Sequence, residues 1–376
     1  MKILIAGDTV PTFNNQKLFM DGEIEKLLGG DLLKIWNSYE HKILNLETPL
    51  YDGNEKIKKT GVCLKANTEC INAIKKLNLD VVCLANNHIM DSTEKGLFST
   101  IEILKKNNIN YIGVGDNIIN IKKYFEMSKE VVCYNFCDVE FSGASQKKPG
   151  TNTYSEFDTF DDIRNLKKIY KNIIVIFHGG KEQYRYPTPK LQKICRKCIE
   201  CGANIVVCQH SHCIGSYEKY YEGHIIYGQG NFLFCKNDNE YWNSGMLIEY
   251  DNTENNVSFI PYIKEENHIS MIAKDSNIYK NIMNDFSLRN KEIVEEKVQE
   301  KFNDYCKKNI DRYLEDIRKK NFFFKVINKI CNHKLSYMLY DEKQLLNLLN
   351  DIQCEAHKEI MLSGLKMKLF GGKNEE

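Results

Sequence analysis

The sequence predicts an α/β fold in which short apolar strands alternate with amphipathic helices over most of the 376-residue chain. Two observations indicate this class. Runs rich in β-branched residues, such as 172–177 and 205–208, read as buried strands, and segments such as 93–106 carry apolar residues at helical spacing. A third observation is that several strands end in an acid, an amide or an imidazole. Because ligands of open α/β sheets bind at the carboxyl ends of strands, these ends indicate a site.

Composition excludes several classes of protein. Hydrophobic residues make up 42% and aromatic residues 11% of the chain, which is enough for a packed core and excludes wholesale disorder. The 52 basic and 51 acidic residues nearly cancel, leaving a formal net charge of +1. The chain as a whole is therefore not attracted to nucleic acid or to an anionic membrane, and we expect no nucleic-acid partner. A charged substrate would be held by local groups.

Apolar patterning predicts neither a membrane span nor a signal peptide. No run of about 18 apolar residues occurs, and the apolar stretch that opens the chain, Met1 to Ala6, is too short for a signal peptide. We therefore expect a cytoplasmic protein whose 14 cysteines are free thiols. Cys195, Cys198 and Cys201 lie at i, i+3 and i+6 in a helical pattern that begins at Thr188. They are predicted to be core residues, and a metal or cluster motif is the alternative.

The first two predicted strands each end beside a carboxylate. Residues 2–7 form an apolar strand that ends at Asp8, and residues 42–46 form a second strand followed by Glu47. Pro49 stops regular structure after Glu47, which favours its position at the strand edge. Residues 17–36 between them carry helical patterning. A single acid at a strand end is commonly a solvated or capping residue, so neither acid identifies a site by itself.

The third predicted strand, 80–85, ends in an unusually polar sequence. Asn86, Asn87 and His88 follow it directly, and a helix is predicted over 93–106. Polar side chains next to so apolar a strand are costly to bury without partners, and a metal site supplies such partners. Asn87 offers a neutral oxygen ligand, and His88 offers a hydrogen-bond donor or a proton.

Another buried strand, 172–177, ends at His178, and two glycines follow it. The glycines allow the backbone to turn close to whatever His178 binds. Lys181, Glu182 and Arg185 come next, and we interpret them as a substrate-binding loop that holds an anionic group by charge and hydrogen bonds. The alternative is an ordinary exposed connector.

The strand at 205–208 leads into His210 and His212, which are two residues apart. At a strand-to-loop corner both imidazoles can face one centre. A pair of loop histidines is the alternative interpretation of His-x-His alone. Further strands are predicted near 225–227, 245–250 and 257–262. Five strand ends then carry acids, an amide and imidazoles, a mixture that divalent ions bind, so we predict a metal site there.

These strand ends occur in motifs that resemble those of the CapA-type capsule or poly-γ-glutamate biosynthesis proteins, which are related to the calcineurin-like metallophosphoesterases. The resemblance covers residues 1–262, and its six motifs follow the family's order. The motifs are Gly7-Asp8, Asn45-Leu46-Glu47, Asn86-Asn87-His88, His178-Gly179-Gly180-x-Glu182, His210-x-His212 and Tyr227-Gly-Gln-Gly-Asn231-Phe232.

The resemblance implies a four-layer α/β/β/α sandwich over residues 1–263 with one or two divalent ions, whose identity among Mn, Fe, Zn and Mg is open. It implies that Asp8, Glu47 and His212 face one ion. Glu47, which bridges, would join Asn87, His178 and His210 at the other. His88 would act beside the ions as a catalytic acid or as a stabiliser of the transition state, and Asn231 would contact substrate. One departure is Val10, which stands where the related enzymes carry a histidine ligand.

Residues 264–376 lie outside the resemblance and are predicted to form a helical C-terminal extension, through which a protein partner could bind. Two functions from different classes remain open. The first is a metal-dependent hydrolase of a phosphoester or a related ester or amide, linked to capsule or poly-γ-glutamate-type polymer biosynthesis. The second is a noncatalytic metal-binding assembly factor for an anionic surface polymer. Val10 favours the second function, and the density of metal ligands favours the first.

Overall fold

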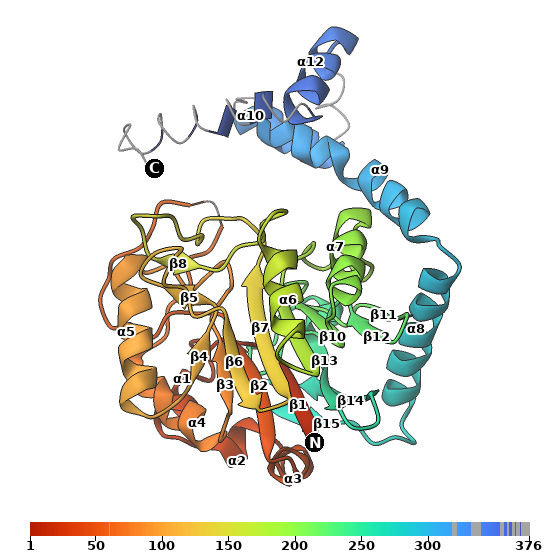
Figure 1. Ribbon diagram of the computed structural model, residues 1–376. Helices are drawn as coiled ribbons and strands as arrows, with labels where there is room; N and C mark the ends of the chain where they lie inside the picture. The colour runs from red at the N-terminus through yellow and green to blue at the C-terminus, as the bar shows by residue number, and fades with distance from the viewer. Residues whose placement is uncertain are drawn as a thin grey trace. The chain divides into compact units, whose positions relative to one another are not determined.

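The computed structural model describes residues 1–59, 61–317, 322–331 and 340–353, together with residues 357, 358, 361, 362, 365 and 369. The chain divides into two compact units, Met1–Val298 and Gln299–Glu376. The first unit contains two large β-sheets and the helices that cover them (Figure 1).

The first sheet has seven strands in the order β15-β14-β13-β1-β2-β3-β4. Strands β1 to β4 of this sheet are parallel, and β13 joins β1 in the antiparallel direction. The predicted strands at 2–7, 42–46, 80–85, 245–250 and 257–262 are all confirmed here. The bounds are β1 (Lys2–Thr9), β2 (His41–Leu46), β3 (Val81–Cys83), β4 (Tyr111–Ile112), β13 (Ser244–Asp251), β14 (Asn256–Lys264) and β15 (Ile269–Met271).

The second sheet has six strands in the order β11-β12-β10-β9-β7-β6, of which β7, β9, β10 and β12 are parallel. Sequence reasoning did not predict the edge strands β6 and β11, which are only partly buried and lack a continuous apolar run. The bounds are β6 (Tyr124–Ser128), β7 (Val131–Cys137), β9 (Asn172–His178), β10 (Ile205–Gln209), β11 (Tyr217–Tyr220) and β12 (Gly223–Ile226), with a separate small pair β5 (Val114–Gly115) and β8 (Gly150–Thr151).

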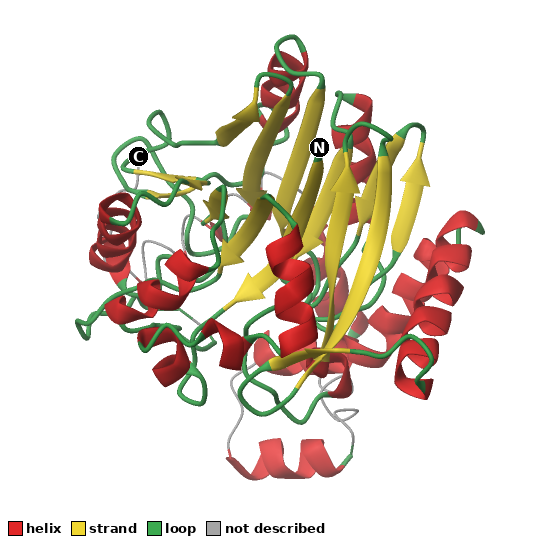
Figure 2. Ribbon diagram, turned by 90° about the horizontal axis from the view of Figure 1, so that it is seen from below, coloured by secondary structure: helices red, strands yellow, loops and turns green. Residues whose placement is uncertain are grey.

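Three apolar clusters show that the sheets pack face to face between outer helices. One cluster joins side chains of both sheets, among them Ile5 and Ile43 from the first and Ile176 and Val207 from the second. The other two lie between each sheet and its own helices. Figure 2 shows the strands gathered between helices on either side. The predicted four-layer α/β/β/α arrangement is confirmed.

The helices follow the predictions with one correction. The helical pattern over 17–36 forms three short helices because Gly22 adopts a positive φ of 68° and Leu28 is extended. Cys195 and Cys198 of α7 are fully buried core residues, as predicted, and the cysteines within the described residues are all free. The helices of the first unit are α1 (Gln16–Met20), α2 (Ile24–Leu27), α3 (Gly30–Ser38), α4 (Ile71–Lys76), α5 (Thr93–Lys106), α6 (Thr159–Lys167), α7 (Pro189–Glu200) and α8 (Asn277–Val294), with 3-10 turns η1 (Thr68–Cys70) and η2 (Glu240–Asn243).

Helix α8 belongs to the first compact unit, although it lies beyond residue 263. Its side chain Phe286 is buried in the core between the sheets and packs edge-on against Phe259 of β14, with ring centroids 4.9 Å apart. β15 also continues the first sheet beyond that residue. The expected boundary at 263 marks the extent of the family resemblance and stays a prediction, whereas the compact unit ends at Val298.

The second unit is helical within its described residues. It contains most of α9 (Val298–Ile317) and all of α10 (Phe322–Ile330) and α12 (Glu342–Gln353). Large apolar side chains there are exposed, including Ile330, Leu346 and Ile352. Among the helices formed by described residues, none has the length and apolar character needed to cross a membrane. The expected protein partner of this region stays a prediction.

The position of α8 generates the first testable prediction. A chain that ends after Val298 should unfold in urea at about the midpoint of the full chain. A chain that ends after Lys264 should be far less stable, because it loses β15, α8 and the buried Phe286. Removing one buried Phe side chain alone typically costs about 3–5 kcal/mol, out of a total of about 5–15 kcal/mol. Unfolding is monitored by circular dichroism. Equal urea midpoints for the two shortened chains would contradict the assignment of α8 to the first unit.

Candidate metal centre

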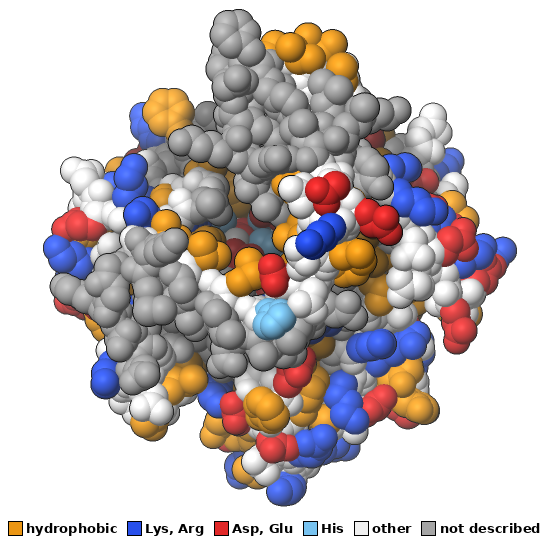
Figure 3. All heavy atoms as spheres, turned by 90° about the horizontal axis from the view of Figure 1, so that it is seen from above, with side chains coloured by type: hydrophobic (Ala, Val, Ile, Leu, Met, Phe, Trp, Pro, Cys, Tyr) orange, Lys and Arg blue, Asp and Glu red, His pale blue; other side chains and the backbone are white. Residues whose placement is uncertain are grey.

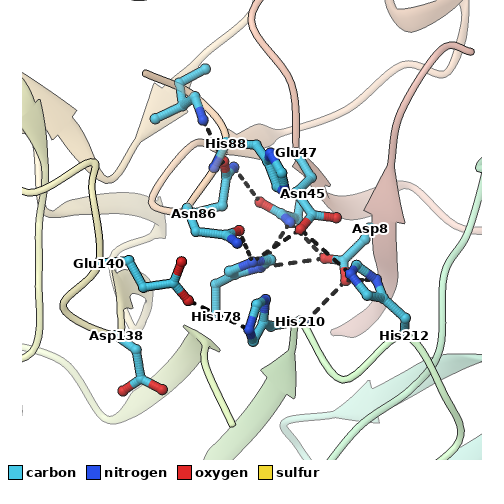
Figure 4. A network of polar contacts seen from close by, with 12 residues as sticks. Asp8, Asn45, Glu47, Asn86, His88, Asp138, Glu140, His178, His210 and His212 are labelled. Carbon is cyan, nitrogen blue, oxygen red and sulfur yellow. Dashed lines mark hydrogen bonds and ion pairs between the residues drawn. The ribbon is translucent and has the colours of Figure 1, made fainter. Parts of the chain in front are cut away.

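Parallel strands of both sheets bring the predicted ligands to one edge of the sandwich, as Figure 4 shows. Asp8 lies near the end of β1, Glu47 directly follows β2, and Asn87 comes four residues after β3. From the second sheet, His178 ends β9, and His210 and His212 follow β10. All six side chains are buried. The predicted convergence of these residues is therefore what the structure shows.

His178 lies at the middle of the cluster. Its Nε2 is 3.0 Å from Asn87 Oδ1 and 3.2 Å from Glu47 Oε1, and its Nδ1 is 3.5 Å from Asp8 Oδ1. Two groups offer ligand atoms that lie within 4.8 Å of one another, namely Glu47 with His178 and His210, and Asp8 with Glu47 and His212. Glu47 is shared by both groups. This is the arrangement that the family resemblance implies for a bridging carboxylate.

The cluster fits a divalent cation because Glu47 lacks other partners. Its side chain is fully buried, and apart from its ion pairs with His178 and His212 neither carboxylate oxygen accepts a hydrogen bond from any described residue. Nδ1 of the buried His210 also lacks a partner among these residues. A buried carboxylate without partners costs several kcal/mol, and a bound cation is one of the few groups that offset such a cost. Mixed carboxylate, amide and imidazole donors suit Mn, Fe, Zn or Mg.

Burial and mutual charge shift the pKa values of these groups in opposite directions. Burial lowers the pKa of His178, but the Asp8 and Glu47 carboxylates outweigh it and raise that pKa to about 10. Burial raises the pKa of Asp8, and the imidazoles of His178 and His212 overcome it, so the pKa lies well below its usual range. Burial, with His178 and His212 nearby, holds the pKa of His210 well below its usual value. The cluster thus keeps Asp8 anionic and His210 neutral, the forms that bind metal, whereas His178 is protonated and would have to release its proton when an ion binds.

The backbone at the His-x-His corner is strained. His210 has φ of 83° and His212 has φ of 54°, a region that residues other than glycine rarely adopt. Such conformations cost roughly 1–3 kcal/mol each and persist where the surrounding contacts enforce them. The His210 N–H donates to Asp8 Oδ2 at 3.0 Å, and Gln183 N–H donates to the Ser211 carbonyl at 2.7 Å. Both proposed imidazole ligands are therefore presented from a corner with positive φ that these hydrogen bonds support.

Three asparagines orient the ligands. Asn45 Nδ2 donates to Asp8 Oδ1 at 2.6 Å and lies 3.3 Å from His178 Nδ1. Asn86 Nδ2 donates to Asn45 Oδ1 and to the Leu46 carbonyl. Sequence reasoning did not assign roles to Asn45 and Asn86, although Asn45 stands two residues before Glu47, where a strand places it on the same face.

The third, Asn231, was predicted to contact substrate. Its Oδ1 lies 2.7 Å from His212 Nδ1 and is placed to accept that proton. Such an outer hydrogen bond fixes the tautomer of a metal-binding imidazole and leaves Nε2 for the ion. Contact with substrate stays a prediction for this residue, and the orientation of His212 is the role its contact supports.

His88 stands beside the cluster within its own buried network. Its Nδ1 is 2.6 Å from Asp91 Oδ2, and Lys59 Nζ lies 2.5 Å from Asp91 Oδ1. Sequence reasoning did not identify Lys59, whose loop carries no motif. Because Asp91 holds Nδ1, Nε2 is the nitrogen of His88 that remains to exchange a proton.

The three charged residues on the loop after His178 have different surroundings. Glu182 is exposed, and its carboxylate lies within 4.8 Å of ligand atoms of His210 and His212, so it is a further candidate ligand. Arg185 Nε donates to the Ile214 carbonyl at 3.2 Å, and its guanidinium lies over the Tyr241 ring. Lys181 is partly buried. The predicted substrate contacts of these three residues stay predictions.

Two further features at the site came only from the structure. Glu140 Oε1 lies 3.6 Å from His210 Nε2, and sequence reasoning assigned no role to this residue. Trp242 packs on the His212 ring with centroids 4.6 Å apart, and the buried Lys264 lies over the Trp242 ring. Burial lowers the pKa of Lys264 to about 7, although the Asp8 and Glu47 carboxylates act to raise it.

Figure 3 shows a hollow on this face with acidic and histidine side chains at its base and hydrophobic side chains around it.

A family model described as bacterial capsule synthesis protein PGA_cap matches residues 2–236. The capsule biosynthesis protein CapA of Bacillus anthracis is 26% identical over 235 residues, which are 60% of this chain and 56% of that protein. The PGA biosynthesis protein CapA of Bacillus subtilis is 28% identical over 207 residues, which are 53% of this chain and 54% of that protein.

A probable polyglutamine synthesis accessory protein of Mycobacterium tuberculosis is 25% identical over 207 residues, which are 51% of this chain and 54% of that protein. The chain therefore spans about half the length of the curated relatives it matches. Among solved structures, a hypothetical protein from Thermus thermophilus aligns with 71% of this chain and 100% of its own. The TM-score is 0.45 and the identity 11%.

Metal binding should depend on His210 and not on other buried histidines. Added Mn²⁺ at about 100 times its Kd should stabilise the parent by about 2.7 kcal/mol, because it binds only the folded state. His210→Ala should lose this stabilisation. His224→Ala is the matched control, because His224 is equally buried but lies on β12 beside Tyr217 and Asn255. Equal Mn²⁺-dependent shifts in Tm for both variants would exclude His210 as a ligand.

The two ions should bind with different affinities. Asp8, Glu47 and His212 offer three ligands to one ion, and the buried Val10 beyond Asp8 offers none. The other ion has Glu47, His178 and His210, with Asn87 Oδ1 beside His178. Calorimetric titration should therefore resolve one tight and one weaker ion. Two equally tight ions would show that another side chain, such as Glu182, completes the weaker site.

Proposed function

Because the chain belongs to the bacterial capsule synthesis protein family PGA_cap, we propose that it acts in the biosynthesis of a capsule or poly-γ-glutamate-type polymer as a metal-dependent hydrolase. The observation that carries the proposal is the buried Glu47 carboxylate, shared by two groups of potential ligands and without a hydrogen-bond partner among the described residues. Its ion pairs with His178 and His212 are the contacts with described residues that compensate this carboxylate, and a bound cation would supply further charge. The names of the relatives from the two Bacillus species support the link to capsule or PGA biosynthesis.

The proposed reaction is hydrolysis of a phosphoester or of a related ester or amide. Divalent ions held by Asp8, Glu47, Asn87, His178, His210 and His212 would supply Lewis-acid polarisation of a phosphoryl or acyl oxygen and activate water. His88 would give a proton to the leaving group from Nε2, since Asp91 holds its Nδ1. Lys59 supports this geometry by pairing with Asp91.

The proposed substrate is an anionic small molecule or polymer. Lys181 and Arg185 lie on the loop that follows His178, where an anionic group next to the ions would meet positive charge. Balanced overall charge means that such local groups, and not the chain as a whole, would attract the substrate. A cytoplasmic location remains part of the proposal.

A second candidate function is a noncatalytic assembly factor that binds an anionic polymer through the same metal centre. Val10 favours it, because valine cannot serve as the imidazole ligand that related enzymes carry there. The printed name of the mycobacterial relative, an accessory protein of polyglutamine synthesis, also fits this class.

Metal analysis of the purified protein, followed by a screen of phosphomonoesters, phosphodiesters and γ-glutamyl amides, tests the first function against the second. Turnover that requires the added metal and is lost in Glu47→Gln supports the hydrolase. A metal-loaded protein that turns over none of these substrates and still binds poly-γ-glutamate would favour the assembly factor.

His88 separates catalysis from metal binding. His88→Ala should lower kcat for the best substrate by about 10²- to 10⁴-fold, the usual contribution of positioned proton transfer, while metal content stays unchanged. His41→Ala is the control, because His41 begins β2 at the opposite end of the strand from Glu47. A His88→Ala protein with unchanged kcat would show that His88 has a structural role.

A further inference from the structure

Helix α8 lies against the loop that carries two of the proposed metal ligands. Arg289 on α8 donates from Nε to the Gly215 carbonyl at 2.8 Å and from Nη2 to the Ile214 carbonyl at 3.3 Å. These carbonyls come two and three residues after His212. Arg289 is 4% exposed, so the two bonds form in a dry environment. An arginine from outside the family-matched segment 2–236 thus holds the end of the His-x-His loop.

Further contacts join α8 to the loops that follow both histidine strands. Arg185, on the loop after His178, also donates to the Ile214 carbonyl and pairs with Asp285 of α8 at 3.6 Å. Tyr186 of the same loop donates its hydroxyl to Glu292 of α8. On the other side, the Tyr217 N–H donates to Asn290 Oδ1 at 2.7 Å. One helix therefore contacts both loops that leave the proposed centre.

The helix itself is anchored independently of these polar contacts. Phe286, one turn before Arg289, is buried in the core between the two sheets. Because the core fixes Phe286, the guanidinium of Arg289 reaches the loop from a rigid base. Burial, with Arg185 close by, lowers the pKa of Arg289 to about 10. The fold thus buries a cation next to a second cation in order to bind two loop carbonyls.

The loop that Arg289 holds is the one whose backbone is strained. His210 and His212 both adopt positive φ, and such conformations relax unless outside contacts hold them. Asp8 and Gln183 hold the beginning of the corner, and Arg289 and Arg185 hold its end.

We propose that α8 is a clamp on the metal centre and that Arg289 is its positioning residue, which keeps His210 and His212 in the conformation that binds metal. This inference rests on the proposed metal centre. Helix α8 would then be part of the functional unit, although the family-matched segment ends before it.

The test compares three variants of the full chain. Arg289→Met removes both hydrogen bonds and keeps most of the side-chain volume, and Arg289→Lys keeps one charged donor. Ile293→Val is the matched control, because it trims another buried side chain of the same helix and does not remove a bond to the loop. Mn²⁺ binding is measured by titration at a temperature where all variants are folded. Hydrogen exchange of peptides covering 209–216 is measured without metal.

Arg289→Met should weaken Mn²⁺ binding by about tenfold or more, equivalent to about 1.4 kcal/mol, and should speed exchange in 209–216. Arg289→Lys should recover part of both, and Ile293→Val should change Mn²⁺ affinity by less than about twofold. Equal Mn²⁺ affinity in Arg289→Met and the parent, or equal losses in Arg289→Met and Ile293→Val, would overturn the clamp. If Arg289→Met does not fold, Arg289→Lys is judged by the same comparison.

The experiment also distinguishes this inference from the proposed function. A parent protein that binds no Mn²⁺ while folded would count against the metal centre itself. In that case hydrogen exchange by itself tests the clamp. If the exchange rates of peptides covering 209–216 are the same in Arg289→Met and the parent, the clamp is overturned.

Discussion

The rest of the site depends on one constraint, the burial of the Glu47 carboxylate at the edge shared by two sheets. A carboxylate in a dry environment must be compensated by charge or by hydrogen bonds. Around Glu47 the fold provides the imidazoles of His178 and His212 from the second sheet, both at ion-pair distance, and a further acid from the first sheet. His178 and His212 lie close enough to Glu47 to compensate this negative charge. Neither sheet alone carries a complete set of ligands.

The register of the paired strands sets which residues reach the shared edge. Asp8 pairs with Asn45 across β1 and β2, and Gln209 pairs with His178 across β10 and β9. A slip of one residue in any of these pairs would turn a ligand to the opposite face of its sheet. The apolar core between the sheets, with Ile5 and Ile43 against Ile176 and Val207, holds the two edges at a fixed distance. The core therefore positions the site as well as stabilising the fold.

The site includes residues that lie outside the family motifs. Lys59 supports Asp91 and His88 from a long loop, Lys264 and Trp242 form a wall beside His212, and Arg289 reaches the His-x-His loop from α8. These residues contact the proposed ligands or His88 and are not themselves proposed as ligands. A centre with strained histidines needs such support, because the metal-binding conformation is not the one the local backbone prefers.

The sequence by itself determined the α/β class, most strands of the parallel core and the set of polar residues at their ends. Apolar runs of strand length and an abrupt change to Asp8, Glu47, His178 or His210 are local signals, and parallel strands bring their ends together. The edge strands β6 and β11 were missed because they are only partly buried and lack a continuous apolar run. The helical pattern expected over 17–36 is interrupted at Gly22, whose positive φ the apolar spacing does not reveal. Only the tertiary structure showed that Asn231 orients His212, that Glu182 reaches the histidine pair, and that α8 belongs to the first unit. Those facts depend on contacts between residues far apart in the chain, and such contacts leave no periodic or local pattern in the sequence.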